Sequence, residues 1–237
     1  TYTGQPYAPW KGRKRGALPI ALRPEQLVTC VQNHDQVGNR AFGTRLSHDA
    51  GIERFALATM LILFLPMTPL LFMGQEWAAT SPFLFFTDHE GELGEAVTKG
   101  RRKEFEGFAA FRNAHASEKI PDPQSTESFE RSKLRWEERR SEPHSHVLEL
   151  HRAMLALRRD DPVISEPCGW GDVEAIARGE ILEVVRRHGA GTRRLLLNFG
   201  DEAGVFAKPA DARVLLAWGT VEGDRLDAHS ALLLAID

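Results

Sequence analysis

The sequence has few features of a secreted or membrane-bound protein. Its 237 residues include only two cysteines, Cys30 and Cys168, which form no C-x-x-C pattern and fit a reducing compartment better than a disulfide framework. Residues 1–16 contain no apolar core of the signal-peptide type. Two prolines interrupt the most apolar stretch, residues 55–72, which leaves no run long enough to span a bilayer. We therefore expect a cytoplasmic protein without a membrane partner.

An excess of charge of one sign is also missing. The 30 Lys and Arg residues oppose 33 Asp and Glu residues, which gives a formal net charge of −3. Nucleic-acid-binding domains are usually strongly basic, and the short basic clusters at residues 11–15 and 101–103 are typical of solvated surface. We expect no nucleic-acid partner.

Several motifs of common enzyme chemistries are absent from the sequence. It has no G-x-x-x-x-G-K-[ST] loop for phosphate and no G-x-S-x-G elbow of serine hydrolases. His144, His146 and His151 are close in sequence, but no Cys pair or carboxylate at ligand spacing completes a zinc site. We expect no metal and no cofactor.

The apolar pattern predicts a strand, a helix and a second strand in the first part of the chain. Residues 27–31 (LVTCV) form a short apolar, β-branched run that is typical of a buried parallel strand. Residues 52–65 have helical length and are apolar almost all round, ending before Pro66. Residues 68–73 (TPLLFM) predict another buried strand. Such units build parallel α/β sheets.

The remaining segments predict loops, one helix and a separate β domain. Residues 1–24 are rich in Gly, Pro and basic side chains and predict a long loop, and residues 78–142 predict a long polar stretch of functional character. Residues 146–159 predict an amphipathic helix. Short apolar runs separated by turns follow, as in small antiparallel β domains. We expect domains at residues 1–165 and 166–237.

A polar triplet, Asn33-His34-Asp35, directly follows the first predicted strand. In a (β/α)₈ barrel, the active site is built from side chains at the C-terminal ends of strands. An Asp there can accept hydrogen bonds from substrate hydroxyls, and Asn and His add donors. The structural alternative is an Asp that caps the next turn and a His satisfied by backbone.

These segments resemble the α-amylase superfamily of glycoside hydrolases. Its fourth signature region, in which Asn-His-Asp ends the seventh barrel strand, is similar to VQNHDQVGNRAFGTRL, and its later Gly-x-Glu motif is similar to PLLFMGQEW. Within the superfamily, the chain most resembles the malto-oligosyltrehalose trehalohydrolases, in the segments PMTPLLFMGQEWAATSPFLFFTDH, ELGEAVTKGRRKEFEGF and SKLRWEE. The resemblance implies an α/β fold: the last two βα units of a (β/α)₈ TIM barrel, followed by a small antiparallel β-sandwich.

The resemblance also implies roles for the triplet and its neighbours. Asp35 corresponds to the family's third carboxylate, which grips sugar hydroxyls as the ring flattens toward the oxocarbenium-like transition state. His34 is expected to bind the same sugar. Asn33 is expected either to bind it or to hold the turn, and Arg40 either to support the site or to form a structural salt bridge.

Later segments supply further substrate-binding candidates. Glu76 is a candidate for the rim of the site and Trp77 for stacking on a sugar face. The structural alternative places Trp77 in the core and Glu76 beside an Arg. Four charged residues are candidates for the reducing-side subsites that accept the trehalose unit: Asp88, His89, Arg101 and Arg102. Solvated loop charges are the alternative for these four.

The family's other two carboxylates are not found in this chain. Retaining hydrolysis needs a nucleophile and an acid about 5–5.5 Å apart, and in the family both precede the Asn-His-Asp region. The only acidic residue before Asp35 is Glu25, at the wrong end of its strand. We therefore expect both groups on a missing N-terminal part of the same enzyme, and this chain alone to be inactive. Because two strands cannot close a barrel, residues 1–160 are not expected to fold stably alone.

The expected reaction is hydrolysis of the α-1,4-glucosidic bond next to the terminal trehalose of maltooligosyl trehalose, which releases trehalose. One alternative is another superfamily enzyme that branches or debranches glucans, and the FTDH and GRRKEF segments argue against it. A second alternative, for the isolated chain, is a non-catalytic carbohydrate-binding fragment.

Overall fold

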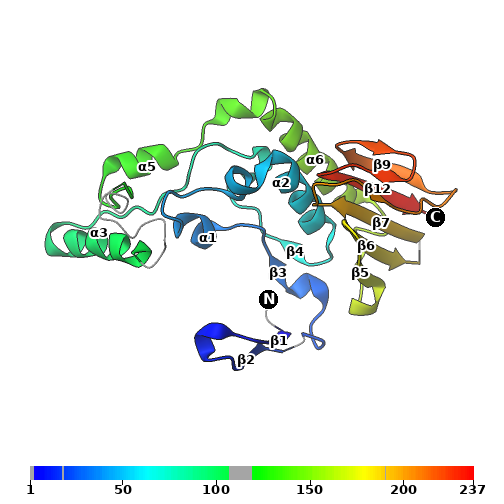
Figure 1. The fold of residues 1–237 in the computed structure, drawn as a ribbon, viewed down its shortest axis with the longest axis horizontal. Coiled ribbons are helices and arrows are strands. Elements are labelled where there is room, and N and C mark those ends of the chain that lie inside the picture. Colours follow the sequence, from blue (N-terminus) through cyan, green and yellow to red (C-terminus); the bar gives the residue numbers. More distant parts are fainter. Residues whose placement is uncertain (1–2, 18, 107–118, 190) are drawn as a thin grey trace.

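In the computed structural model of the protein, residues 3–17, 19–106, 119–189 and 191–237 are described. The α-helices are α1 (His34–Gly38), α2 (Leu46–Phe64), α3 (Gly91–Phe105), α5 (Thr126–Ser132) and α6 (His144–Asp160). The first strands are β1 (Thr3–Pro6), β2 (Lys14–Gly16), β3 (Val28–Thr29) and β4 (Thr68–Pro69). The later strands are β5 (Val173–Arg178), β6 (Ile181–His188), β7 (Gly191–Asn198), β8 (Gly204–Val205), β9 (Arg213–Trp218), β10 (Val221–Glu222), β11 (Arg225–Leu226) and β12 (Ser230–Ile236). Helices α2 and α6 lie beside the later strands, and α3 and α5 lie at the opposite end (Figure 1).

The two predicted strands form a parallel pair, but they are shorter and more exposed than expected. In β3 and β4, Val28 lies opposite Thr68 and Thr29 lies opposite Pro69. The predicted burial is wrong, since Val28 is 65% exposed and Leu70, directly after β4, is 41% exposed. The physical reason is that this sheet contains only these two strands in the part of the chain that the structure describes.

Helix α2 carries the central apolar core. It begins at Leu46, earlier than the predicted residue 52, and Gly51 (φ +80°) kinks it. It ends as predicted, with extended backbone at Leu65 ahead of Pro66. Five large side chains of α2 are fully buried: Phe55, Leu57, Met60, Leu63 and Phe64. Across the described residues, no helix combines the length and the apolarity needed to cross a bilayer.

Helix α6 packs on α2, and its predicted apolar stripe is confirmed. Val147, Leu150 and Met154 are buried, and Leu157 is half-buried against the same core. The spacing of three or four residues places these side chains on one helix face.

Arg158 of α6 closes the C-terminal end of α2. Its Nη1 donates to the carbonyl oxygens of Leu63 and Leu65 at 3.0 and 2.6 Å, and its Nη2 donates to that of Met67 at 2.7 Å. The last carbonyls of a helix have no partner within the helix. Arg158 therefore satisfies the end of α2 and fixes the chain that leads into β4.

The C-terminal strands are antiparallel, as predicted. One sheet has the order β5-β6-β7-β12-β9 and a smaller one the order β10-β11-β8. Val184, Leu195 and Leu233 face the core that contains α2 and α6. Their immediate neighbours along β7 and β12, Leu196 and Leu232, join a second cluster that also includes Leu226 of β11. This alternation is expected for a sheet covered on both faces. The domain boundary near residue 165 stays a prediction, because α2, α6 and the inner face of the larger sheet share one apolar core.

Two segments predicted as loops contain regular structure. Within residues 1–24, β1 and β2 form an antiparallel hairpin. Within residues 78–142 the chain forms α3, α5 and a 3₁₀ helix, Trp136–Arg140, while residues 107–118 lie outside the described part. Helix α3 buries only Gly94, Arg101 and Phe105, so it has too few apolar positions to produce a helical signal.

Arg158→Ala is expected to lower the free energy of unfolding by about 2 kcal/mol, because it removes charge-assisted hydrogen bonds to three carbonyls. Urea unfolding of the full-length protein measures this. Arg159→Ala is the matched control, since Arg159 is exposed and, among the described residues, binds only its neighbour Asp160. Equal effects of the two substitutions would contradict the role of Arg158.

Candidate functional site

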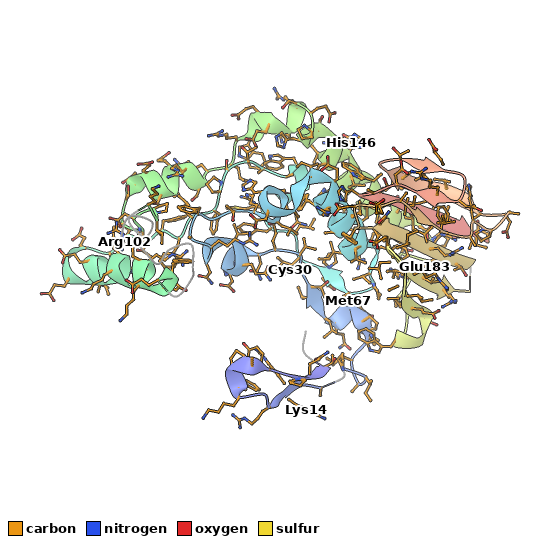
Figure 2. All side chains as sticks on the ribbon, in the orientation of Figure 1. Lys14, Cys30, Met67, Arg102, His146 and Glu183 are labelled. Atoms are coloured by element: carbon orange, nitrogen blue, oxygen red, sulfur yellow. The ribbon has the colours of Figure 1, made fainter. Side chains whose placement is uncertain are left out.

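The two candidate motifs lie at the same edge of the parallel pair. The triplet follows β3 and begins α1, and the Gln75–Trp77 turn follows β4. Because β3 and β4 run in parallel, their C-terminal ends share one edge. Cys30 lies between β3 and α1 at this edge (Figure 2). The fold therefore brings together two segments that are about 40 residues apart.

Within the triplet, Asn33 has a structural role and the other two residues are exposed. Asn33 is the N-cap of α1: its Oδ1 accepts from Gln36 N at 3.1 Å. The side chains of His34 and Asp35 are 69% and 73% exposed, with His34 Nε2 3.4 Å from Asp35 Oδ1. An exposed pair of this kind contributes little to stability. Because both side chains are exposed, a ligand can reach them. The turn-holding alternative for Asn33 matches this geometry.

Gln32 anchors the triplet to α2. It is 2% exposed, and its Oε1 accepts from Leu46 N at 2.9 Å. This hydrogen bond satisfies one of the free amides at the start of α2. Sequence reasoning did not identify Gln32, although a polar residue next to an apolar strand is a usable signal.

Arg45 connects the start of α2 to the turn after β4. Its side chain is fully buried. Its Nε donates to Ser81 O at 2.6 Å and its Nη1 to Met73 O at 2.8 Å, while the guanidinium lies 5.3 Å from the centroid of the Phe72 ring. These carbonyls lie on either side of the Gln75–Trp77 turn, so one side chain fixes both ends of that turn. Sequence reasoning missed this residue also.

Two carboxylates balance the buried charge. Burial lowers the pKa of Arg45 to about 10, and the negative charges of Glu76 and Glu138 act in the opposite direction. Glu138 accepts hydrogen bonds from Thr80, from the amide at 3.1 Å and also from the hydroxyl. Partial burial pushes the pKa of Glu138 up, but these hydrogen bonds and the nearby charge of His144 outweigh it, so this pKa lies below its usual range.

In the Gln75–Trp77 turn, Trp77 and Glu76 both fit the structural alternative better than a role in sugar binding. Trp77 is 4% exposed and packs at 5.1 Å from the Trp136 ring, and its carbonyl accepts from His144 Nδ1 at 2.8 Å. It therefore offers no free face for a sugar and belongs to the core, as the alternative held. Glu76 is half-buried, and its negative charge acts to raise the pKa of Arg45, which fits the alternative of a structural partner.

Two of the predicted binding arginines hold the backbone together. Arg40 pairs with Asp49 and donates to Thr44 Oγ1 at 3.2 Å, so it forms the structural salt bridge. Arg101 is 6% exposed, and its Nη2 donates to the carbonyls of Gly38 and Arg40 at 2.8 and 2.9 Å. Arg101 thus bridges α3 to the end of α1, and the burial of its guanidinium favours a structural role over the expected place in an open subsite.

The remaining candidates line two adjacent clefts. His89 and Arg102 share a cleft of about 630 Å³ with Asp122 and Gln124, and Arg102 is marked on α3 in Figure 2. Asp88 lines a second cleft, of about 390 Å³, which also contains Gln124. The Gln124 amide lowers the pKa of Asp122, and the charge of Arg102 lowers it further. The structure therefore brings His89 and Arg102 together, with Asp88 next to them.

Two of the three histidines of α6, His144 and His151, bind main-chain carbonyls. His144 donates to Trp77 O, and His151, which is 1% exposed, donates through Nδ1 to Val147 O at 2.9 Å. Over the described ranges, no three His, Cys, Asp or Glu side chains are grouped as metal ligands.

Glu138→Gln is expected to destabilise the protein by about 1 kcal/mol at pH 7, because it removes the charged acceptor for Thr80. A carboxylate with a lowered folded pKa contributes stability above its unfolded value, near 4.5, and loses that contribution as the pH falls. The difference from wild type should therefore shrink below pH 4.5 in urea unfolding series. The neighbouring Glu137→Gln is the control, and a difference that grows on acidification would contradict the account.

Sequence comparisons relate most of the chain to one set of enzymes. Malto-oligosyltrehalose trehalohydrolase of Deinococcus radiodurans is 45% identical over 209 residues, which cover 87% of this chain and 34% of the relative. The Brevibacterium helvolum enzyme of the same name is 38% identical over 235 residues, which cover 98% of this chain and 35% of the relative. Residues 168–233 match a family model described as a domain of unknown function (DUF3459).

Two solved structures are similar to this chain in fold. A Salmonella typhimurium protein described as a candidate alpha amylase aligns with 99% of this chain and 39% of its own, at a TM-score of 0.84 and 36% identity. Isomaltulose synthase SmuA from Protaminobacter rubrum shares the fold alone, with a TM-score of 0.57 and 12% identity over 89% of this chain and 43% of its own. By sequence, the chain is related to the malto-oligosyltrehalose trehalohydrolases and spans about a third of their length.

Proposed function

We propose that this chain is part of a glycoside hydrolase that cleaves the α-1,4-glucosidic bond next to the terminal trehalose of maltooligosyl trehalose and releases trehalose. The observation that carries the proposal is the exposed Asp35–His34 pair at the shared strand edge. The similarity to enzymes named malto-oligosyltrehalose trehalohydrolase supports the choice of substrate.

In this proposal Asp35 stabilises the transition state. Its exposed carboxylate accepts hydrogen bonds from two sugar hydroxyls, and these bonds strengthen as the ring flattens and gains positive charge. His34 lies 3.4 Å from Asp35 Oδ1, close enough to contact the same sugar. Gln32 and Asn33 hold this pair through the hydrogen bonds that start α2 and α1. Carboxylate chemistry is sufficient for this reaction, so the proposal includes no cofactor.

The proposal locates the nucleophile and the general acid on a preceding part of the same enzyme. Two observations support it. The relatives are about three times as long as this chain, which spans 34% of the Deinococcus radiodurans enzyme. Val28 of the parallel pair and Leu70, directly after it, are also 65% and 41% exposed, as expected for strands that pair and pack with further strands. The free cysteines Cys30 and Cys168 fit a cytoplasmic location.

Asp35→Asn in the full-length protein is expected to lower kcat about 100- to 1,000-fold with little change in KM, because the lost contact is strongest in the transition state. Chromatographic measurement of trehalose released from maltotriosyl trehalose tests this. Asp211→Asn, at an exposed aspartate of the β domain, is the control.

The two parts of the proposal can fail separately. Glucose or branched glucan as the product of the wild-type protein would overturn the substrate assignment. An unchanged rate in Asp35→Asn, with trehalose still released, would overturn only the role of Asp35.

A further inference from the structure

We propose that the cleft lined by Phe86 and Phe129, here called the Phe86–Phe129 cleft, binds a glucopyranose ring. Asp88 and Gln124 are among the polar residues of its lining. The inference rests on the proposed function for its substrate class, and it adds two aromatic residues and one amide that the sequence did not single out.

The aromatic part of the cleft is a pair of edge-to-face rings. The Phe86 and Phe129 centroids are 5.4 Å apart, with an interplanar angle of 64°. Phe129 is 45% exposed, which is unusual for a Phe that has an apolar neighbour to pack against. Phe86 in turn contacts Phe83 at 6.0 Å, so the exposed ring stands on a packed aromatic base. Aromatic faces of this kind match the C–H faces of a pyranose.

The polar part of the cleft is held in place by hydrogen bonds. Gln124 Nε2 donates to Thr87 Oγ1 at 2.6 Å, and Gln124 Oε1 accepts from His89 N at 2.8 Å. A second link joins the same segments, since Thr87 N donates to Pro123 O at 2.8 Å. Asp88 lies between these links and is exposed. A fixed amide and an accessible carboxylate beside an aromatic ring are suited to binding hydroxyl groups.

Charge and size favour a neutral sugar. The carboxylate of Asp88 disfavours an anion, and Lys99 and Arg102 line the other cleft. Lys133 Nζ lies 4.7 Å from the centroid of the Phe129 ring, but its charge is paired with Glu130 at 2.7 Å. The volume of about 390 Å³ lies at the lower end of the range for small-molecule sites. The ring could come from the trehalose unit or from the glucan chain, and the two sources are separated by the choice of probe.

The test is titration calorimetry of the full-length protein with trehalose and, separately, with maltopentaose. An Asp35→Ala background prevents turnover and weakens binding at the Asp35 site. Phe129→Ala in that background is expected to raise the Kd for at least one of the sugars about five-fold or more. A response to trehalose alone assigns the cleft to the trehalose unit, and a response to maltopentaose alone assigns it to the glucan chain.

Two further variants keep the test decisive. Leu93→Ala removes a side chain of α3 that is 58% exposed and should leave both Kd values unchanged. Asp88→Asn, at an exposed position, should weaken binding without affecting the fold. Both Kd values unchanged in Phe129→Ala and Asp88→Asn, or no binding of either sugar, would overturn the inference. If sugar binding depends on Phe129 but the wild-type protein releases no trehalose, the proposed function is refuted and the sugar-binding role of the cleft is retained.

Discussion

The buried guanidinium of Arg45 is the interaction on which the arrangement of the strand-end segments depends. It binds Met73 O and Ser81 O, on either side of the turn after β4, while the adjacent residue Leu46 donates to Gln32 beside the triplet. A buried cation is costly unless it is paired and hydrogen-bonded, and here Glu76 and Glu138 supply the opposite charge. The exposed residues thus stand on a base held by these hydrogen bonds, while Arg45 Nη2 and Gln32 Nε2 have no hydrogen-bond partner among the described residues.

The C-terminal sheet supports this base from the other side of α2. Arg186 of β6 donates through Nη1 to Phe64 O at 2.9 Å, and Arg54 of α2 donates to Phe199 O at 3.2 Å. One apolar core joins α2, α6 and the inner face of the sheet. Helix α2 begins directly after Arg45 and ends at carbonyl oxygens that Arg158 binds. The β domain therefore holds the helix that positions the site. Its packing on α2 gives the domain a structural role in holding that helix.

The sequence predicted those features that have a strong local signal. The end of α2 at Pro66, the stripe of α6 and the antiparallel strands follow from proline geometry and apolar periodicity, and the triplet was placed correctly at a strand end. Arg101 and Arg102 could not be separated, since only the tertiary fold buries one and leaves the other in a cleft. The burial of Trp77 likewise depends on Trp136, which is distant in the sequence. The binding roles of Asp35, His34, Asp88, His89 and Arg102 stay predictions.

The central claim is that this chain supplies one part of a divided active site in a trehalose-releasing enzyme. The most direct measurement is trehalose release from maltotriosyl trehalose by this chain alone, by the preceding segment of the enzyme alone, and by the two expressed together. The account predicts release only from the combination, with the rate lowered about 100- to 1,000-fold when the chain carries Asp35→Asn. Release by either piece alone at the rate of the combination would contradict it.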